Sequence, residues 1–489
     1  MRGGGGAPQA APFAREARFA LRTGGRRIRG PPRAPRLNPA VRHSVLRDPV
    51  QGDVLLTHEE LALLDTREMQ RLRGVKQLGS ADLVYPGARH TRFEHSIGTA
   101  HLSQQIVDAV NRAAELAPRD CLRIGEAEAR VIRVAALLHD ITHIPYGHHF
   151  EDQAGLLHRH DSPERYERML DGSGEIGAAL RKAGLHRDVL AVLCNRDDTP
   201  PYWRQINSDT ICSDILDYLA RDAYFTGLRI GIDARILAYF RVERASGNLY
   251  LDLAKHNLLR EDILSEIVRI LEARYYFSER VYYHHAKVAA GALVARAVEL
   301  ALAEKLVAET DLYATDDASL LDLLERSAER AKPAVARRLR SLVERYRRRK
   351  LPKRACVFPR PQNQDAQQEL VERYFSLSRH AERSLAEERI ADLVRFATGR
   401  DVEIMLVCPA KRMQLKEVAT HVLWPGEGAV RPLAAYAERA PRLFDLERAY
   451  RDLWKFYVFA DTDDAALLAR IAEIAAAHFP SATNVYRPG

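Results

Sequence analysis

Two histidines and two aspartates on three separate segments have the types and spacing of a hydrolytic metal site. They are His95 in RFEHS, His139 and Asp140 in ALLHDITH, and Asp214 in SDILDYLARD. Imidazole nitrogens and carboxylate oxygens together suit Mn²⁺, Fe²⁺, Zn²⁺ or Mg²⁺, so the residues do not select one metal. A metal with open positions makes a strong nucleophile from water at neutral pH. The four residues therefore predict a metal-dependent hydrolase.

The use of His139 and Asp140 on one ion depends on where their helix ends. Consecutive residues of a helix point about 100° apart, so the two side chains converge only where the chain turns away. Ile141, Thr142 and Pro145 indicate such an end. The preceding apolar run VIRVAALL predicts a buried helix. An imidazole and a carboxylate at its end are costly unless they are paired or bound to a metal.

The segments that carry these residues are expected to be helical. Apolar residues such as Val131, Val134 and Leu138 recur with a period of 3.6. The expected helices are Phe93–Val110, Glu126–Asp140, Pro163–Leu170, Gln205–Phe225 and Arg260–Leu302. Helices from distant segments can bring ligands to one point inside a bundle. We therefore expect a mainly α fold with a helical core over residues 46–302.

The sequence pattern at the two ends of the globular region differs from that of the helical core. DPVQGDVLLT predicts a turn and a strand, and Thr57 with Glu60 predicts a capped helix after it. Residues 303–384 are rich in charge and are expected to be a helical extension that includes the basic run RYRRRKLPKR. Residues 385–489 predict a smaller C-terminal α+β subdomain. Its expected strands are DVEIMLVCP, KEVATHVLW and KFYVFAD, and its last helix is Ala465–His478.

The net charge of +8 comes from the first residues and not from the globular region. Residues 1–37 contain nine arginines and one acid, Glu16, which alone give +8 and leave the other 452 residues formally neutral. Glycine and proline in this stretch predict a disordered basic tail over residues 1–45. A basic tail on a neutral body is weak support for nucleic-acid binding.

Cysteine and hydropathy patterns exclude several other classes. The five cysteines lie far apart and form no CxxC pair, so neither a zinc ribbon nor a disulfide framework is indicated. No apolar run reaches transmembrane length, and the first residues lack the apolar segment of a secretory signal. We expect a protein of the cytoplasm with no membrane role.

Three long motifs resemble the HD-domain deoxynucleoside triphosphate triphosphohydrolases, which include bacterial dNTPases and dGTPases. The motifs are RLRGVKQLGSADLVYPGARHTRFEHSIGTAHL, AALLHDITHIPYGHHFED and DYLARDAYFTGL, in the order of the family. The similarity extends from about Asp48 to Leu302. The resemblance implies a helical HD core that binds a divalent metal ion. It implies as metal ligands His95, His139, Asp140 and Asp214.

The resemblance also implies a pocket for a deoxynucleotide. The residues that match substrate contacts of the family are Gln77, Leu78, Arg92, Tyr218, Asp222, Arg274 and Tyr282. By this match Arg92 grips the triphosphate, Tyr218 lies against the deoxyribose, and Asp222 accepts the 3′-hydroxyl. Gln77 and Leu78 pack around the sugar, and the remaining two contact phosphate and base.

A further group matches the catalytic residues of the family. It consists of His143, His148, Glu151, His160 and Asp161. By this match Glu151 orients His148. Position 161 departs from the family because it holds Asp in place of the usual Glu. A second departure is Ile215, which stands where the animal enzyme has a phosphate-binding lysine and so removes one cation from the triphosphate cradle.

The implied reaction releases inorganic triphosphate and a deoxynucleoside from a dNTP. Metal-activated water attacks the α-phosphorus, and an imidazole, either His143 or His148, protonates the leaving 5′-oxygen. Other HD-type phosphohydrolases use the same ligands, so a cyclic-dinucleotide phosphodiesterase or an alarmone hydrolase is an alternative. A nucleotide- or nucleic-acid-binding component of a defence system is another. Because family relatives form dimers or tetramers, we expect a homo-oligomer and an allosteric nucleotide.

Overall fold

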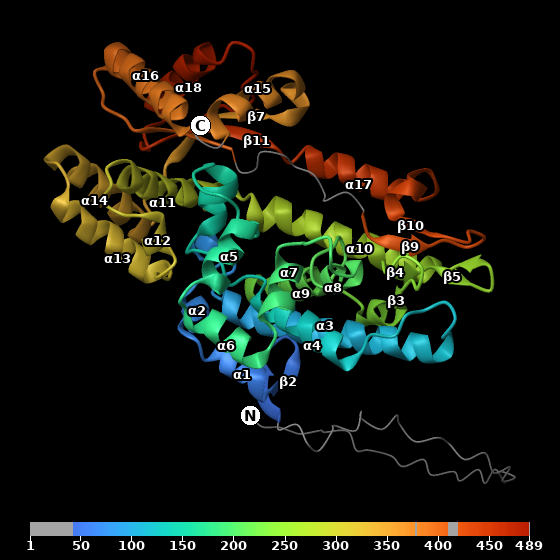
Figure 1. Cartoon of the computed structure of the whole chain (residues 1–489). Coiled ribbons are helices and arrows are strands. Elements are labelled where there is room, and N and C mark those ends of the chain that lie inside the picture. Colours follow the sequence, from blue (N-terminus) through green and yellow to red (C-terminus); the bar gives the residue numbers. More distant parts are fainter. Residues whose placement is uncertain (1–42, 377–378, 409–418, 489) are drawn as a thin grey trace, which may run out of the picture. The chain divides into compact units, whose positions relative to one another are not determined.

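The computed structural model describes residues 43–376, 379–408 and 419–488, which are mainly α-helical, as expected (Figure 1). The expected tail lies outside the described residues except for its last three. Strand β1 (His43–Asp48) pairs antiparallel with β2 (Gly52–Thr57), and Gly52 turns the chain at φ 81°. Helix α1 (His58–Leu64) then begins with the expected capping box of Thr57 and Glu60, and α2 (Arg67–Arg71) follows.

Three helices form the frame of the core. Helix α3 (Arg92–Leu116) packs against α4 (Glu126–Leu138) and α9 (Ser213–Thr226), as Figure 1 shows. The approach of α3 to α9 is close because Gly98 has no side chain, and a Cβ there would meet Asp217 Oδ1 at 2.0 Å. Helix α4 is buried along its last two turns and ends at Leu138. The expected helix end before Asp140 is confirmed.

The chain between α4 and α9 is broken into short helices. They are α5 (Pro163–Asp171), α6 (Glu175–Ala183), α7 (His186–Leu193) and α8 (Pro201–Gln205). The single helix expected over Gln205–Phe225 is wrong, because residues 206–212 interrupt it. Asn207 uses its side chain to bond the Ile132 carbonyl and Ser213, and such short polar side chains compete with helical bonding.

The helix expected over Arg260–Leu302 is also divided. Helix α10 (Glu261–Phe277) runs into a π-helical turn, η5 (Ser278–Tyr282), and α11 (His285–Ala303) begins after His284, whose ring accepts from the Ala286 amide. Before α10 the chain forms strands inside the stretch expected to be helical. They are β3 (Phe240–Val242), β4 (Leu249–Asp252), β5 (Ala254–Lys255) and β6 (Leu258–Leu259). Strands of two to four residues are too short to show a period in sequence.

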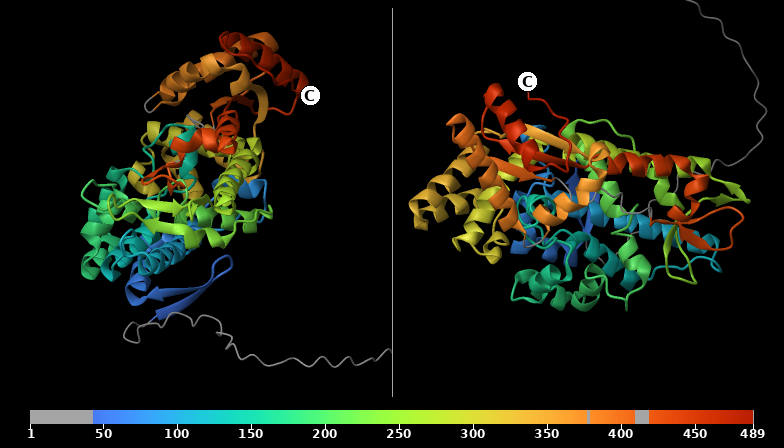
Figure 2. Two further views of the ribbon diagram at one scale, coloured as in Figure 1. Left: turned by 90° about the vertical axis from the view of Figure 1, so that its right-hand side faces the viewer. Right: turned by 90° about the horizontal axis from the view of Figure 1, so that it is seen from above.

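Helices α12 (Glu309–Leu312), α13 (Asp317–Ser327) and α14 (Pro333–Arg347) follow α11, and then the C-terminal α+β part begins. Its sheet has the order β7-β11-β8, from β7 (Lys353–Pro359), β11 (Lys455–Ala460) and β8 (Ile404–Val407). Its helices are α15 (Gln364–Phe375), α16 (His380–Thr398) and α18 (Ala465–His478), which gather around the sheet in Figure 2. The last helix has the expected bounds, but β7 lies in the extension that was expected to be helical.

The second expected strand of this part, KEVATHVLW, contains a strand of another sheet. Strand β9 (His421–Leu423) pairs parallel with β4 of the core and antiparallel with β10 (Val430–Pro432), and α17 (Pro441–Arg451) follows. Residues 416–418 of the expected strand lie outside the described residues. The C-terminal segment therefore contributes one strand pair to the core sheet, in the order β10-β9-β4-β3.

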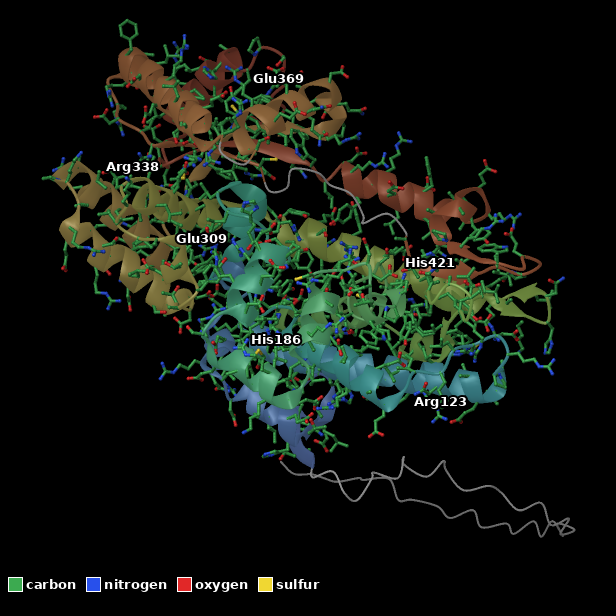
Figure 3. All side chains as sticks on the ribbon, in the orientation of Figure 1. Arg123, His186, Glu309, Arg338, Glu369 and His421 are labelled. Atoms are coloured by element: carbon green, nitrogen blue, oxygen red, sulfur yellow. The ribbon has the colours of Figure 1, made fainter. Side chains whose placement is uncertain are left out.

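The basic run at the end of α14 is largely paired. Arg338, labelled in Figure 3, and Arg345 both bond Glu403, at 3.0 and 2.9 Å. Arg347 pairs with Asp322 and Glu325 of α13. Many of these arginines thus form ion pairs that link α14 to neighbouring elements. Within the described ranges, no helix combines the length and the apolar character that a membrane span requires.

Candidate active site

The four expected metal ligands meet at one point between α3, the end of α4 and the start of α9. His95 Nε2 lies 3.0 Å from Asp214 Oδ1 and 3.2 Å from His139 Nε2. Asp140 approaches the same point, with its oxygens 3.5 Å from His139 Nε2 and 3.9 Å from His95 Nε2. Ligands about 2.1 Å from one ion lie roughly 3.0–3.4 Å apart, so these spacings suit a single cation.

The hydrogen bonds behind the two histidines prepare them for a metal. His95 Nδ1 lies 2.9 Å from Asp217 Oδ2, and His139 Nδ1 lies 2.7 Å from the Ala136 carbonyl. Each of these acceptors takes an N–H, so the Nε2 atoms of both rings point toward each other and toward Asp214. The carboxylates beside His95 favour positive charge at this point: burial lowers the pKa of His95, but the bonds to Asp214 and Asp217 outweigh it and raise the pKa to about 10. The residues present therefore fit a divalent metal ion.

Asp217 is itself part of a buried network that the sequence did not reveal. Its carboxylate accepts Arg221 Nε at 2.8 Å and Gln51 Nε2 at 2.7 Å in addition to His95. Arg221 is completed by Asp48 at 2.8 Å, from the β1–β2 hairpin. The orientation of His95 thus depends on a chain of buried charges that runs back to the hairpin.

Charge in the site favours ionised carboxylates. Burial opposes ionisation of Asp140, but Arg92 and His139 outweigh it and hold its pKa well below the ordinary value. Burial opposes ionisation of Asp214 as well, and the bonds to His139 and His95 lower its pKa. Arg92 donates to Asp140 Oδ2 at 2.6 Å, so this arginine neutralises a ligand and at the same time lines the cavity. A cation in the cluster meets carboxylates that are already charged.

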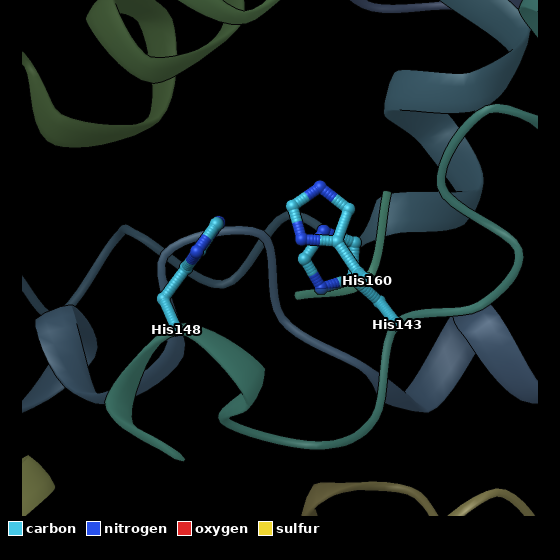
Figure 4. Close-up of side chains that lie close together, drawn as sticks. All are labelled: His143, His148 and His160. Carbon is cyan, nitrogen blue, oxygen red and sulfur yellow. The ribbon is translucent and has the colours of Figure 1, made fainter. Parts of the chain in front are cut away.

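A second group of three histidines, His143, His148 and His160, lies close together in Figure 4. The rings of His143 and His160 stack with centroids 3.6 Å apart, and His148 lies edge-on to both. His143 Nε2 is 3.3 Å from Asp140 Oδ1 without the alignment of a hydrogen bond. Stacked rings aim their nitrogen lone pairs side by side and not at one point. The group therefore suits proton transfer and phosphate contact better than a second metal.

Two neighbouring acids lie beside these histidines. Glu151 bonds His160 Nδ1 at 3.0 Å and Arg165 at 2.8 Å, and it lies 4.0 Å from His148 Nδ1. Glu151 is thus the more distant of two acids beside His148. Asp152 is the nearer one, with Oδ2 3.0 Å from His148 Nδ1. Both acids lie in a π-helical turn, η3 (His149–Gln153), directly after His148.

The loop between His143 and His148 is pinned at its middle. Tyr146 adopts a left-handed backbone with φ 56°, an unusual conformation for a bulky residue. Its buried ring packs edge-on against Tyr346 at 5.6 Å, and its hydroxyl lies 3.4 Å from the Asp317 carbonyl. These contacts stabilise the strained backbone at Tyr146. The conformation of this loop determines the positions of His143 and His148.

Aromatic and acidic residues form the other side of the site. Tyr282 donates to Asp222 Oδ2 at 2.5 Å, and the rings of Tyr218 and Tyr282 are 6.3 Å apart. His90 bonds the second oxygen of Asp222 at 2.7 Å and stacks on Phe225. His90 and Tyr282 therefore fix the Asp222 carboxylate between aromatic rings. A carboxylate held in this way could accept a hydrogen bond from a hydroxyl group of a bound ligand.

All expected site residues but one line a single cavity of about 570 Å³. The exception is Glu151, which lies behind His160. Among the lining residues Gln77 Oε1 and Arg274 Nη1 are buried without a hydrogen-bond partner, and Leu78 is buried. Asp161 pairs with Arg159 at the rim. The sequence did not single out Asp152, Asp217, His90 or Lys287, although the first three lie within the matched motifs.

Family comparisons agree with this architecture. A model of the HD domain matches residues 92–222, and a model of the HD associated region matches residues 254–479. Fold and site thus define a chain with an HD domain and an HD associated region, whose histidine and aspartate cluster could hold a metal ion.

Individual relatives place the chain more closely. It is 32% identical over 299 residues to an uncharacterized protein of Methanocaldococcus jannaschii, a match that covers 60% of this chain and 58% of the relative. It is 32% identical over 244 residues to the uncharacterized protein YwfO of Bacillus subtilis, which covers 49% and 52%. It is 26% identical over 337 residues to the deoxynucleoside triphosphate triphosphohydrolase SAMHD1 homolog of Dictyostelium discoideum, which covers 63% and 59%. The matches thus span little more than half of each relative.

A solved structure shares the fold. It is that of a hypothetical protein from Aquifex aeolicus, with a TM-score of 0.62 and 22% identity over 89% of this chain and 100% of that one.

Proposed function

We propose that the protein hydrolyses deoxynucleoside triphosphates to deoxynucleosides and inorganic triphosphate. The observation that carries this proposal is the single cavity in which the metal cluster lies between two kinds of wall. One wall holds arginines and free imidazoles, which suit phosphates. The other holds Asp222 fixed between Tyr218 and Tyr282, which suits a sugar. The similarity to proteins named deoxynucleoside triphosphate triphosphohydrolases supports the same substrate class.

The metal ligands of this proposal are His95, His139, Asp140 and Asp214. A metal ion bound there supplies Lewis acidity and lowers the pKa of water. The residues around it hold the α-phosphorus next to that water. Arg92 and Arg274 face the cavity and neutralise phosphate charge, which is greatest in the transition state.

The reaction breaks the bond between the α-phosphorus and the 5′-oxygen of the deoxynucleoside. The oxygen of water forms a new bond to phosphorus, and the 5′-oxygen leaves with a proton taken from an imidazole. We assign this donor to His148, which lines the cavity, is half-exposed and has its Nδ1 held by Asp152, so that Nε2 is free to face the substrate. His143 and His160 contact the phosphates from the stacked pair.

The sugar wall gives the proposal its specificity. Asp222 has both oxygens engaged, by His90 and by Tyr282, and exchanges the Tyr282 bond for a 3′-hydroxyl when substrate binds. The Tyr218 ring lies against the metal-side histidine, 6.5 Å from His95 between centroids. A ribose 2′-hydroxyl would meet this ring, so ribonucleotides are poor substrates.

A product-resolved substrate panel tests the proposal. The metal-reconstituted protein is incubated with four dNTPs, four NTPs, a guanosine alarmone and a cyclic dinucleotide, and the products are separated by anion-exchange chromatography. Release of intact triphosphate from dNTPs, lost in a His139→Ala/Asp140→Ala variant, is the expected result. Turnover of the alarmone or the cyclic dinucleotide alone would replace the proposal with one of those activities.

A further inference from the structure

Lys287 is a buried cation that the site does not otherwise use. It lies in the first turn of α11, is about nine-tenths buried and lines the same cavity as the metal ligands. Within the described residues it makes no ion pair with a carboxylate. The amine lies over an aromatic ring, with its nitrogen 5.6 Å from the centroid of Tyr282. A lysine amine in this position has lost most of its hydration without gaining a counterion.

The charges around Lys287 place it between the two walls of the cavity. Burial lowers the pKa of its amine to about 8, Asp222 on the sugar side raises it, and Arg92 on the phosphate side lowers it. On the flank at Asp214 the next residue is the buried Ile215, so that position supplies no cation, although Arg159 and Arg204 also line the cavity. Arg274, the other cation on this side, has one nitrogen buried without a partner.

Lys287 is buried and Arg274 is half-buried, and neither forms an ion pair with a carboxylate within the described residues. A buried charge without a counterion destabilises a fold, and it persists where function needs it. An anionic ligand would remove this cost and would be bound by the energy released. A neutral ligand, or a sugar alone, would leave both cations uncompensated.

We propose that Lys287 binds the phosphate chain of the substrate and supplies, from α11, the cation that the flank at Ile215 lacks. The inference rests on the proposed function and makes it more specific, because it names a phosphate-binding residue on the helix beyond the π-helical turn η5. That turn places Tyr282 against Asp222 and brings the lysine over the same ring. The phosphates would then lie between Lys287, Arg274 and the metal cluster.

Binding of inorganic tripolyphosphate tests the role of the amine separately from catalysis. Isothermal titration calorimetry measures this probe with the full chain in the presence of a chelator, so that metal bound by the probe does not contribute. We expect Lys287→Met to weaken binding by about tenfold or more, a loss of about 1.4 kcal/mol. Lys287→Arg keeps the charge and is expected to stay within about threefold. Lys455→Met, at a partly buried lysine of β11 outside the cavity, is the matched control and is expected to have no effect.

Two further measurements distinguish a binding role from a structural one. Binding of a deoxynucleoside without phosphates is expected to be unchanged by Lys287→Met. The thermal midpoint of Lys287→Met is expected to equal or exceed that of the wild type, because an uncompensated charge is removed.

The inference would be overturned if Lys287→Met bound tripolyphosphate as tightly as the wild type does. An equal loss for the deoxynucleoside would overturn it as well, since the amine would then serve the sugar wall. A different result would contradict the proposed function and not the role of Lys287. In that case tripolyphosphate binding would depend on Lys287, but the wild type would release no triphosphate from any dNTP.

Discussion

The substitution Asp217→Asn isolates the contribution of the residues behind the metal ligands. Asp217 accepts the Nδ1 proton of His95 at 2.9 Å and two nitrogens of Arg221 at 2.8 and 3.0 Å. Asparagine keeps the shape but has only one acceptor oxygen. If that oxygen serves Arg221, the amide NH₂ faces His95, and the imidazole must take its proton on Nε2. That tautomer has no lone pair for a metal.

The expected magnitude follows from this exchange of tautomers. Loss of a partner that orients a metal-bound histidine costs about 10–100-fold in metal affinity, which is about 1.4–2.7 kcal/mol. Stability falls as well, because Arg221 keeps only Asp48 as a counterion in the interior. A loss of affinity must therefore be separated from a loss of fold.

Asp48→Asn is the matched control. Asp48 bonds Arg221 at 2.8 and 3.2 Å and makes no contact with His95, so this variant takes a carboxylate from the same arginine. Equilibrium dialysis against Mn²⁺ followed by elemental analysis, well below both thermal midpoints, gives the affinities. We expect both variants to melt earlier and only Asp217→Asn to bind metal weakly. Equal affinities in the two variants would refute the argument from the tautomer.

Three other predictions follow from single contacts. Gly98→Ala places a Cβ 2.0 Å from Asp217 Oδ1, so it should lower stability by about 1–3 kcal/mol and weaken metal binding in the dialysis assay; a variant that matches the wild type in both would contradict the close approach of α3 and α9. Asp152→Asn should lower kcat by about 10–100-fold with little change in KM, measured as triphosphate release, because His148 loses the partner of its Nδ1; a change in KM alone would speak against a role in proton transfer. Burial raises the pKa of Asp317 to about 7, so the protonated carboxyl favours the folded state below the ordinary pKa and this contribution is lost as the pH rises through 7. Between pH 5 and pH 8 the wild type should therefore lose about 2–3 kcal/mol more of its unfolding free energy than Asp317→Asn, and parallel curves in denaturant titrations would disprove it.

The metal quartet was predictable because its residue types carry the information themselves. A histidine, an adjacent His–Asp pair and a later aspartate are informative wherever their helices lie, and the end of α4 was indicated by the proline that follows. Asp217 was not predictable in the same way. It is one of three acids on α9, two of which meet His95, and the close packing of Gly98 against that helix places Asp217 behind the imidazole.

The features that the sequence did not predict share a physical cause in long-range or irregular geometry. Strand β7 exists because it pairs with β11 about a hundred residues later, and its sequence alone continues a basic helical run. The assignment of Glu151 to His148 came from the resemblance to the family, and the contact of His148 with Asp152 depends on the local turn η3. Lys287 was overlooked because a lysine early in a helix is usually solvated, and only the fold of α11 onto the cavity buries it.

The hairpin at residues 43–57 extends the part of the protein that supports the metal site beyond the HD domain. The HD match begins at residue 92, yet Asp48 and Gln51 of the hairpin hold the charges that fix a metal ligand. A fragment cut at the family boundary would keep all four ligands and lose part of their support. In evolutionary terms, changes at Asp48 can alter the stability of the buried network, and changes at Gln51 reach the Asp217 carboxylate directly, while every ligand stays the same.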